Sequence, residues 1–124
     1  SKAFVKSPFS YRSLGILVAA LGLATSVAPG AAAGAAKPVT HTVNIDGTAF
    51  VPPTITVATG DTIVWVNKDP YPHTATSSAT VKEGGFDSKS IAAEKSWKFT
   101  AKKKGDYPYI CAIHPSMKGT VTVK

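Results

Sequence analysis

The chain of 124 residues contains one cysteine, few charged residues and no run with a helical hydrophobic period. A lone Cys111 excludes a scaffold built on internal disulfides. It also excludes haem attachment through a CxxCH motif and an iron–sulfur cluster held by four thiolates. No internal repeat or phosphate-binding glycine motif is present. The length allows one small domain, and the unpaired cysteine needs an explanation.

The charges are unevenly distributed along the chain. The 14 basic and 7 acidic residues give a net charge of +7. Residues 1–36 contain Lys2, Lys6 and Arg12 but no acid, so residues 37–124 have 11 lysines against 7 acids and a net charge of +4. The lysines are scattered over several turns, including Lys102 to Lys104, which we expect to form a solvated turn. No RNA-reading aromatic motif accompanies them, so we expect no nucleic-acid partner, although acidic proteins would be attracted.

Residues 1–36 have the three parts of a secretory signal peptide. A basic start precedes an apolar stretch from Leu14 to Ala24, and the small residues from Ala31 to Ala36 suit cleavage. Cleavage would leave a domain over residues 37–124 in the periplasm or another exported location. Retention of the uncharged run as a membrane anchor is the alternative, and membrane contact is expected only in that case.

From residue 40 onward the sequence predicts short β-strands separated by turns. The turns contain Gly, Pro and Asp, and residues 81–95 are ambiguous, with room for a short helical turn. This pattern predicts an all-β sandwich or barrel of antiparallel type, with Trp65, Trp97 and Phe99 in the core and His41 as a solvent-facing or hydrogen-bonded strand residue. The expected strands, with β-branched and aromatic residues at a period of two, cover residues 41–45, 54–58, 62–67, 96–100, 107–110 and 120–124.

A cluster of metal-binding side chains lies near the C-terminal end. Cys111, His114 and Met117 stand at positions i, i+3 and i+6, and a short loop can direct all three side chains to one point. His73, which follows a proline-stiffened turn, is the best candidate for a fourth donor. Two imidazoles, a thiolate and a weak axial thioether are the ligands of a blue-copper electron-transfer site. Zinc fits less well because a thioether adds little to its coordination.

These motifs resemble those of the cupredoxins over residues 40–124. Within that family the short spacing from His114 to Met117 is similar to that of the amicyanins, whereas plastocyanins have more residues there. The resemblance implies a Greek-key sandwich of about eight strands that binds one copper ion near one end through His73, Cys111, His114 and Met117. The stretches that carry it are FVPPTITV at 50–57, GDTIVWVN at 60–67, PH at 72–73, GFD at 85–87 and CxxHPxMxG at 111–119.

The resemblance also implies a function. An exported one-electron carrier, monomeric and not an enzyme, would cycle between Cu(II) and Cu(I) and meet its redox partners at an apolar collar around His114. That collar would consist of Pro72, Ala112, Ile113 and Pro115. A copper carrier that delivers metal to another protein is the alternative. An enzyme that uses Cys111 as nucleophile and His114 as base is a third reading, which leaves Met117 and His73 unexplained.

The chain departs from the family at Thr74. An asparagine usually follows the first ligand histidine there, and its side chain helps to join the two ligand loops. A threonine hydroxyl is expected to donate one hydrogen bond with a shorter reach than an amide. The rigidity around the metal and the reduction potential are therefore the properties that this substitution affects.

Overall fold

The computed structural model describes Gly22 and residues 36–124. The predicted signal peptide, its cleavage sites and the alternative of a retained anchor lie outside the described residues, apart from Gly22 and Ala36. Within the described part of the chain, no helix has both the length and the apolar character needed to cross a membrane.

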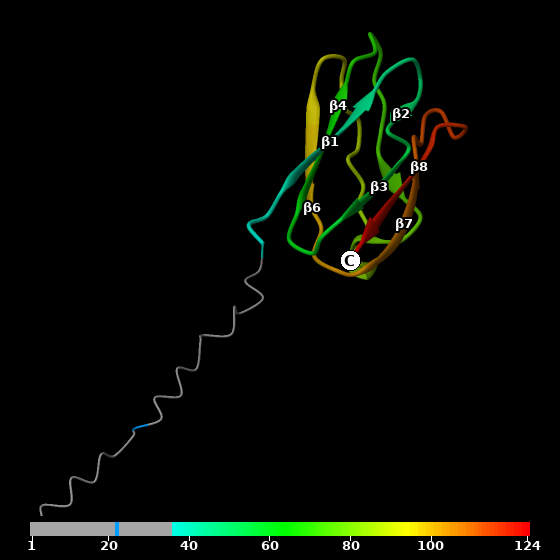
Figure 1. Ribbon diagram of the computed structural model, residues 1–124. Coiled ribbons are helices and arrows are strands. Elements are labelled where there is room, and N and C mark those ends of the chain that lie inside the picture. Colours follow the sequence, from blue (N-terminus) through cyan, green and yellow to red (C-terminus); the bar gives the residue numbers. More distant parts are fainter. Residues whose placement is uncertain (1–21, 23–35) are drawn as a thin grey trace, which may run out of the picture. The chain divides into compact units, whose positions relative to one another are not determined.

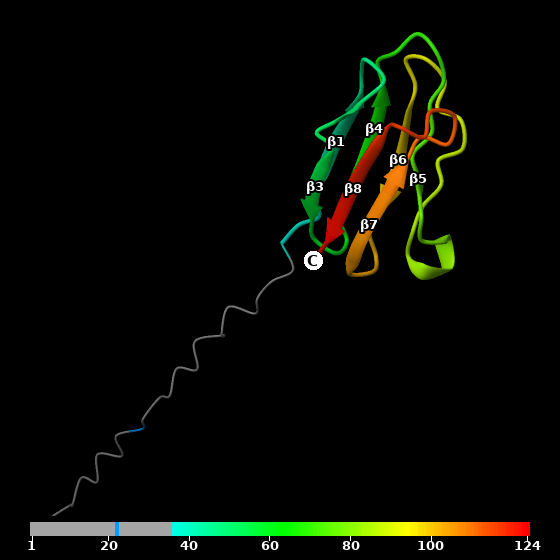
Figure 2. The same cartoon turned by 90° about the vertical axis from the view of Figure 1, so that its right-hand side faces the viewer.

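In the part of the chain that the structure describes, eight strands form two four-stranded sheets that pack face to face (Figures 1 and 2). The predicted all-β sandwich is thereby confirmed. The first sheet has the order β2-β1-β4-β6, with β1 at Thr40–Ile45, β2 at Phe50–Val51, β4 at Thr62–Asn67 and β6 at Ser96–Thr100. The second sheet has the order β3-β8-β7-β5, with β3 at Thr54–Val57, β8 at Lys118–Val123, β7 at Gly105–Ile110 and β5 at Thr76–Ser77.

The core lies between the two sheets and is rich in aromatic rings. Along β4 every second side chain is buried, as the period-two pattern predicts. Trp65 from this strand packs 5.5 Å from Tyr109 of β7 and 5.0 Å from Phe86, measured between ring centroids. Trp97 and Phe99 are partly buried against the same cluster, which confirms them as core aromatics.

The antiparallel type expected from the sequence holds for most strand pairs, but two of the six pairs are parallel. Strand β1 pairs with β4 in parallel, and β3 pairs with β8 in parallel, while the other four strand pairs are antiparallel. Between β1 and β4 the chain passes through β3 of the opposite sheet, so β4 returns beside β1 in the same direction. The hydrophobic alternation reports which side chains are buried and carries no information on strand direction.

Three further features lie outside the pairing of the strands or at its ends. A single 3₁₀ turn at Val81–Glu83 confirms the short helical turn expected in that region. His41 was expected to be either solvent-facing or hydrogen-bonded, and its side chain is hydrogen-bonded to Asp61. The loop that joins β7 to β8 projects at the end of the sandwich away from the C-terminus (Figure 2).

Candidate metal centre

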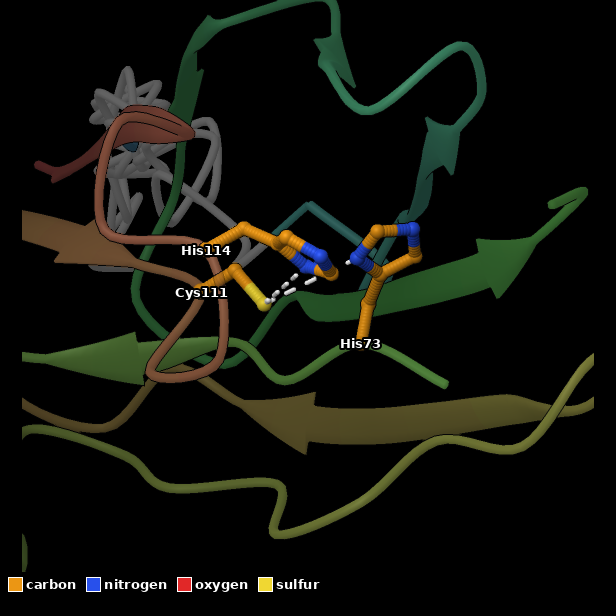
Figure 3. Close-up of side chains that lie close together, drawn as sticks. All are labelled: His73, Cys111 and His114. Atoms are coloured by element: carbon orange, nitrogen blue, oxygen red, sulfur yellow. Dashed lines mark hydrogen bonds between the residues drawn. The ribbon is translucent and has the colours of Figure 1, made fainter. Parts of the chain in front are cut away.

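Three of the four predicted ligand residues converge at this end of the sandwich. The donor atoms of His73, Cys111 and His114 all lie within 4.8 Å of one another. Cys111 Sγ is 3.7 Å from His73 Nδ1 and 3.8 Å from His114 Nδ1, and the three side chains point toward one another (Figure 3). His73 and Cys111 are fully buried, whereas His114 is half-buried.

The loop that carries Cys111, His114 and Met117 is closed by its own backbone hydrogen bonds. The N–H of His114 donates to Cys111 O at 3.1 Å, and the N–H of Met117 donates to His114 O at 2.9 Å. The N–H of Cys111 donates back to Met117 O at 3.2 Å. Met117 is buried, with 3% of its surface exposed. The loop therefore keeps the thioether residue beside the thiol and imidazole residues.

Asp69 fixes the orientation of the His73 ring. Its Oδ2 lies 2.8 Å from His73 Nε2. Burial opposes ionisation of Asp69, but hydrogen bonds from Thr48 N–H, His73 and Gly47 N–H outweigh it and hold the pKa of this carboxyl below its usual value. Because an ionised carboxylate only accepts hydrogen bonds, Nε2 carries the proton. The lone pair on Nδ1 is thus available on the side that faces Cys111.

No pattern in the sequence indicates this role for Asp69, which there forms part of an Asp-Pro turn. The turn is held by Asn67, whose Oδ1 accepts the N–H of Asp69 at 3.0 Å. The Asn67 side-chain amide also donates to Tyr71 O at 2.8 Å and Ile91 O at 3.0 Å. A polar residue at a buried strand end was the available signal, since buried amides are normally hydrogen-bonded.

Tyr71 covers the two imidazoles and was also missed from the sequence. Its ring centroid lies 5.1 Å from that of His73 and 6.0 Å from that of His114. Its hydroxyl is 2.9 Å from Thr48 Oγ1, and the ring is exposed on its outer side. An exposed tyrosine beside two prolines carries no signal of such a contact in the sequence.

Thr74 joins the two ligand loops, but in a different way from the one expected. Its backbone N–H donates to Cys111 Sγ at 3.3 Å. Its hydroxyl accepts the N–H of Ala112 at 2.8 Å, where the sequence suggested a donated bond. The hydrogen bond from this N–H helps to hold the Cys111 sulfur in place across the two loops.

This combination of donors fits copper. The soft sulfur and two imidazole nitrogens are brought together, and no carboxylate belongs to the group in the described residues. Sulfur and imidazole ligands select copper over magnesium or calcium, which prefer oxygen. The fixed proton on His73 Nε2 leaves the nitrogen that faces Cys111 free to bind a metal.

Comparison with known proteins gives matches to copper proteins. Amicyanin from Paracoccus versutus is 32% identical over 83 residues, which cover 66% of this chain and 63% of the relative. The structure of a methionine-to-alanine mutant of amicyanin with Cu(I) has a TM-score of 0.63 at 29% identity, covering 68% of this chain and 82% of the other. The copper-containing nitrite reductase from Thermus scotoductus SA-01 has a TM-score of 0.65 at 28% identity, covering 72% of this chain and 23% of that enzyme.

The matches differ in how much of each protein they cover. The chain spans less than two thirds of the length of the amicyanin it matches. The nitrite reductase contains a domain of this fold within a much larger chain. The model of the cupredoxin-like domain matches residues 14–123, which is most of the sequence. The chain therefore belongs to the cupredoxin-like domain family.

Proposed function

We propose that the chain is a type 1 copper protein that carries one electron between redox partners. The observation that supports this function is the convergence of the Cys111 thiol with Nδ1 of both His73 and His114, in a largely buried group. Copper bound by these donors supplies one-electron chemistry by alternating between Cu(II) and Cu(I).

Each proposed ligand residue has its own part. Cys111 would supply the strongly binding thiolate, His73 and His114 would supply imidazole nitrogens, and Met117 would supply a weakly binding thioether. Asp69 holds the His73 ring, and the Thr74 N–H holds the sulfur. Because the donors are held before metal binds, they need little movement when an electron arrives or leaves.

The apolar collar around His114 is the proposed docking surface for redox partners. Ile113 is 51% exposed, and Pro72, Ala112 and Pro115 are also exposed. His114 is half-buried among them, so a partner seated on the collar comes close to a ligand ring. Exposed apolar side chains with a donor residue at their centre suit brief contacts with a redox protein.

Burial of the donors argues against the alternative of copper delivery. A delivery protein exchanges its metal through accessible ligands, but His73 and Cys111 are each 0% exposed. Transfer of copper to a metal-free acceptor protein within seconds, without oxidation or reduction, would favour delivery. Retention of copper under the same conditions is the result expected of an electron carrier.

The visible spectrum after addition of Cu(II) to the metal-free protein tests the proposed function. We expect an intense blue absorption that disappears on addition of ascorbate and is missing from Cys111→Ser. Ser78→Ala, on the exposed outer surface, is the matched control and should remain blue. A colourless protein that retains zinc in preference to copper would overturn the proposal.

We also propose that the protein is exported. The basic, apolar and small-residue parts of residues 1–36 support this location, and so does the single cysteine, which a bound metal would protect in an oxidising compartment. Fractionation of producing cells, with the mass of the mature chain, tests it. Full-length protein confined to the cytoplasm would contradict export, and full-length protein in the membrane would indicate the retained anchor.

A further inference from the structure

A line of hydrogen bonds leads from the Cys111 loop to a carboxylate at the surface. The N–H of Ala112 donates to Thr74 Oγ1 at 2.8 Å, and Thr74 Oγ1 lies 3.0 Å from Thr76 Oγ1. Thr76 Oγ1 in turn donates to Asp87 Oδ1 at 3.2 Å. We call Thr74, Thr76 and Asp87 the hydroxyl relay. It begins at Thr74, which accepts a hydrogen bond from the residue next to Cys111, and ends at the half-buried Asp87.

The number of available protons determines which group donates in each hydrogen bond of the relay. Asp87 is ionised because the Lys89 N–H, followed by the Lys89 ammonium and the Thr76 hydroxyl, lowers its pKa against the opposing effect of burial. An ionised carboxylate cannot donate, so the only hydroxyl proton of Thr76 goes to Asp87. Thr74 must then donate to Thr76, which leaves the Thr74 oxygen as the acceptor for the Ala112 amide.

The backbone keeps the members of the relay beside one another. Thr76 and Asp87 face each other in an antiparallel bridge. On one side of this bridge the N–H of Ser77 donates to Phe86 O at 2.9 Å, and on the other the N–H of Ser88 donates to Ala75 O at 3.0 Å. The backbone therefore holds the Thr76 hydroxyl and the Asp87 carboxylate close together.

We propose that Thr76 and Asp87 are positioning residues that set the reduction potential of the metal centre through the Thr74 hydroxyl. Hydrogen bonds aligned in series polarise one another, so the negative end at Asp87 makes the Thr74 oxygen a stronger acceptor for the Ala112 N–H. More negative charge next to the Cys111 sulfur stabilises the oxidised, more positive state of a metal bound there. Breaking the relay should therefore raise the potential.

This proposal rests on the proposed function, because its first test measures the potential of bound copper. Hydrogen exchange in the metal-free protein tests the relay independently of copper binding. We expect Thr76→Val and Asp87→Asn to bind copper and to shift the redox equilibrium about threefold toward the reduced form, the effect of losing one ordinary hydrogen bond. That shift is about 28 mV for a one-electron couple. Thr76→Ser, which keeps the hydroxyl, should retain the parent potential.

The Thr122 hydroxyl provides a matched control. It donates to Asp106 Oδ1 at 2.8 Å, a pair of the same chemistry near the opposite end of β7 and β8 from Cys111. Thr122→Val and Asp106→Asn should leave the potential unchanged. If Asp87→Asn moves the potential while Thr76→Val does not, the carboxylate acts through space and the relay is wrong.

Hydrogen exchange of the Ala112 amide in the metal-free protein completes the test. This amide is on an exposed residue, and Thr74 Oγ1 is the acceptor that protects it. Exchange should be faster in Thr76→Val and Asp87→Asn than in the parent and in Thr76→Ser. Unchanged exchange together with an unchanged potential overturns the relay. If the parent protein itself does not bind copper, the proposed function fails, and the exchange rates alone decide on the relay.

Discussion

At the scale of single residues, the carboxylate of Asp69 determines which nitrogen of His73 can bind a metal. It accepts the backbone N–H groups of Gly47 and Thr48 at 2.8 and 2.9 Å in addition to the ring N–H. The residue thus joins the turn after β1 to the first ligand histidine. A change at Asp69 acts on the metal site through the ring that it holds.

The first prediction concerns this carboxylate. Asp69→Asn should lower copper affinity about 10- to 100-fold, the usual effect of losing a partner that orients a ligand. An amide has one accepting oxygen, so one of the three donors is left facing an N–H₂ group. Competition with a chelator of known affinity measures the loss. Asp106→Asn, at an exposed acid, is the control, and equal affinities for all three proteins would contradict this role.

The sequence alone indicates the four proposed ligand residues, three of which the structure brings together, whereas it does not indicate the residues that hold them. Cys111, His114 and Met117 stand close together in one loop, so their spacing alone indicates a shared target. Asp69 reaches His73 only because the intervening turn folds back, and the Thr74 hydroxyl meets Ala112 across 38 positions. Contacts of this kind depend on loop conformation, which hydrophobic periodicity does not encode.

At the scale of elements, β7 and β8 are in close contact where Gly119 faces Tyr109. The two residues are partners in the antiparallel register. A Cβ added to Gly119 would lie 2.3 Å from Cζ of the Tyr109 ring, far inside contact distance. That ring packs 4.6 Å from Phe50 and 5.5 Å from Trp65 between centroids, so it has little room to move.

We therefore predict that Gly119→Ala destabilises the fold by about 1–3 kcal/mol, the usual cost of overpacking a core. Urea denaturation of the metal-free protein measures this change. Lys118→Ala, at the exposed neighbouring position of β8, should have a much smaller effect. Equal midpoints for the two variants would show that the ring yields to the added methyl group.

Asp61 connects three segments at the start of β4. Its carboxylate accepts the N–H groups of Val39 and Ala58, both at 2.9 Å, and lies 2.8 Å from His41 Nε2. The hydrogen bond from Val39 contributes most, followed by those from His41 and Ala58, and together they lower the pKa of Asp61 from 3.8 to about 2. The beginning of β1 is thus joined to β4 through a charged group.

This carboxyl predicts an acid-dependent stability. Because its pKa is lower in the folded state, the unfolded chain binds more protons between about pH 4 and pH 2. The stabilisation is complete above that interval and is lost as the pH falls through about 2. Asp61→Asn should therefore melt below the parent at pH 6, with the gap closing near pH 2. A gap that is constant from pH 6 to pH 2 would exclude the ionised carboxylate as its cause.

The sequence predicted the elements unevenly. Six strands were visible as alternating runs, but β2 and β5 have two residues each and are too short to show a period. The parallel pairing of β1 with β4 was missed because it follows from the path of the chain between the sheets. The composition of a strand does not indicate which other strand it pairs with.

At the scale of the whole molecule, the prediction concerns the apolar collar. Electron self-exchange between reduced and oxidised copies, followed by NMR line broadening, reports on this surface without a partner protein. Ile113→Glu should slow self-exchange about tenfold or more, because two copies that meet at their collars bring like charges together. Val81→Glu, at another highly exposed apolar residue, should have little effect. Equal slowing by both variants would mean that the collar is not the contact surface.

The loop that carries Cys111, His114 and Met117 separates the composition of the metal site from the pairing of the strands. Ile110 and Lys118 form the register pair nearest the loop, and every residue between them is outside the strands. We expect that a change in the length of this loop leaves the pairing of β7 with β8 in register. Three of the four proposed metal donors therefore lie in a loop outside the strand pairing, so we expect that changes in this loop alter the metal site while the two sheets keep their register.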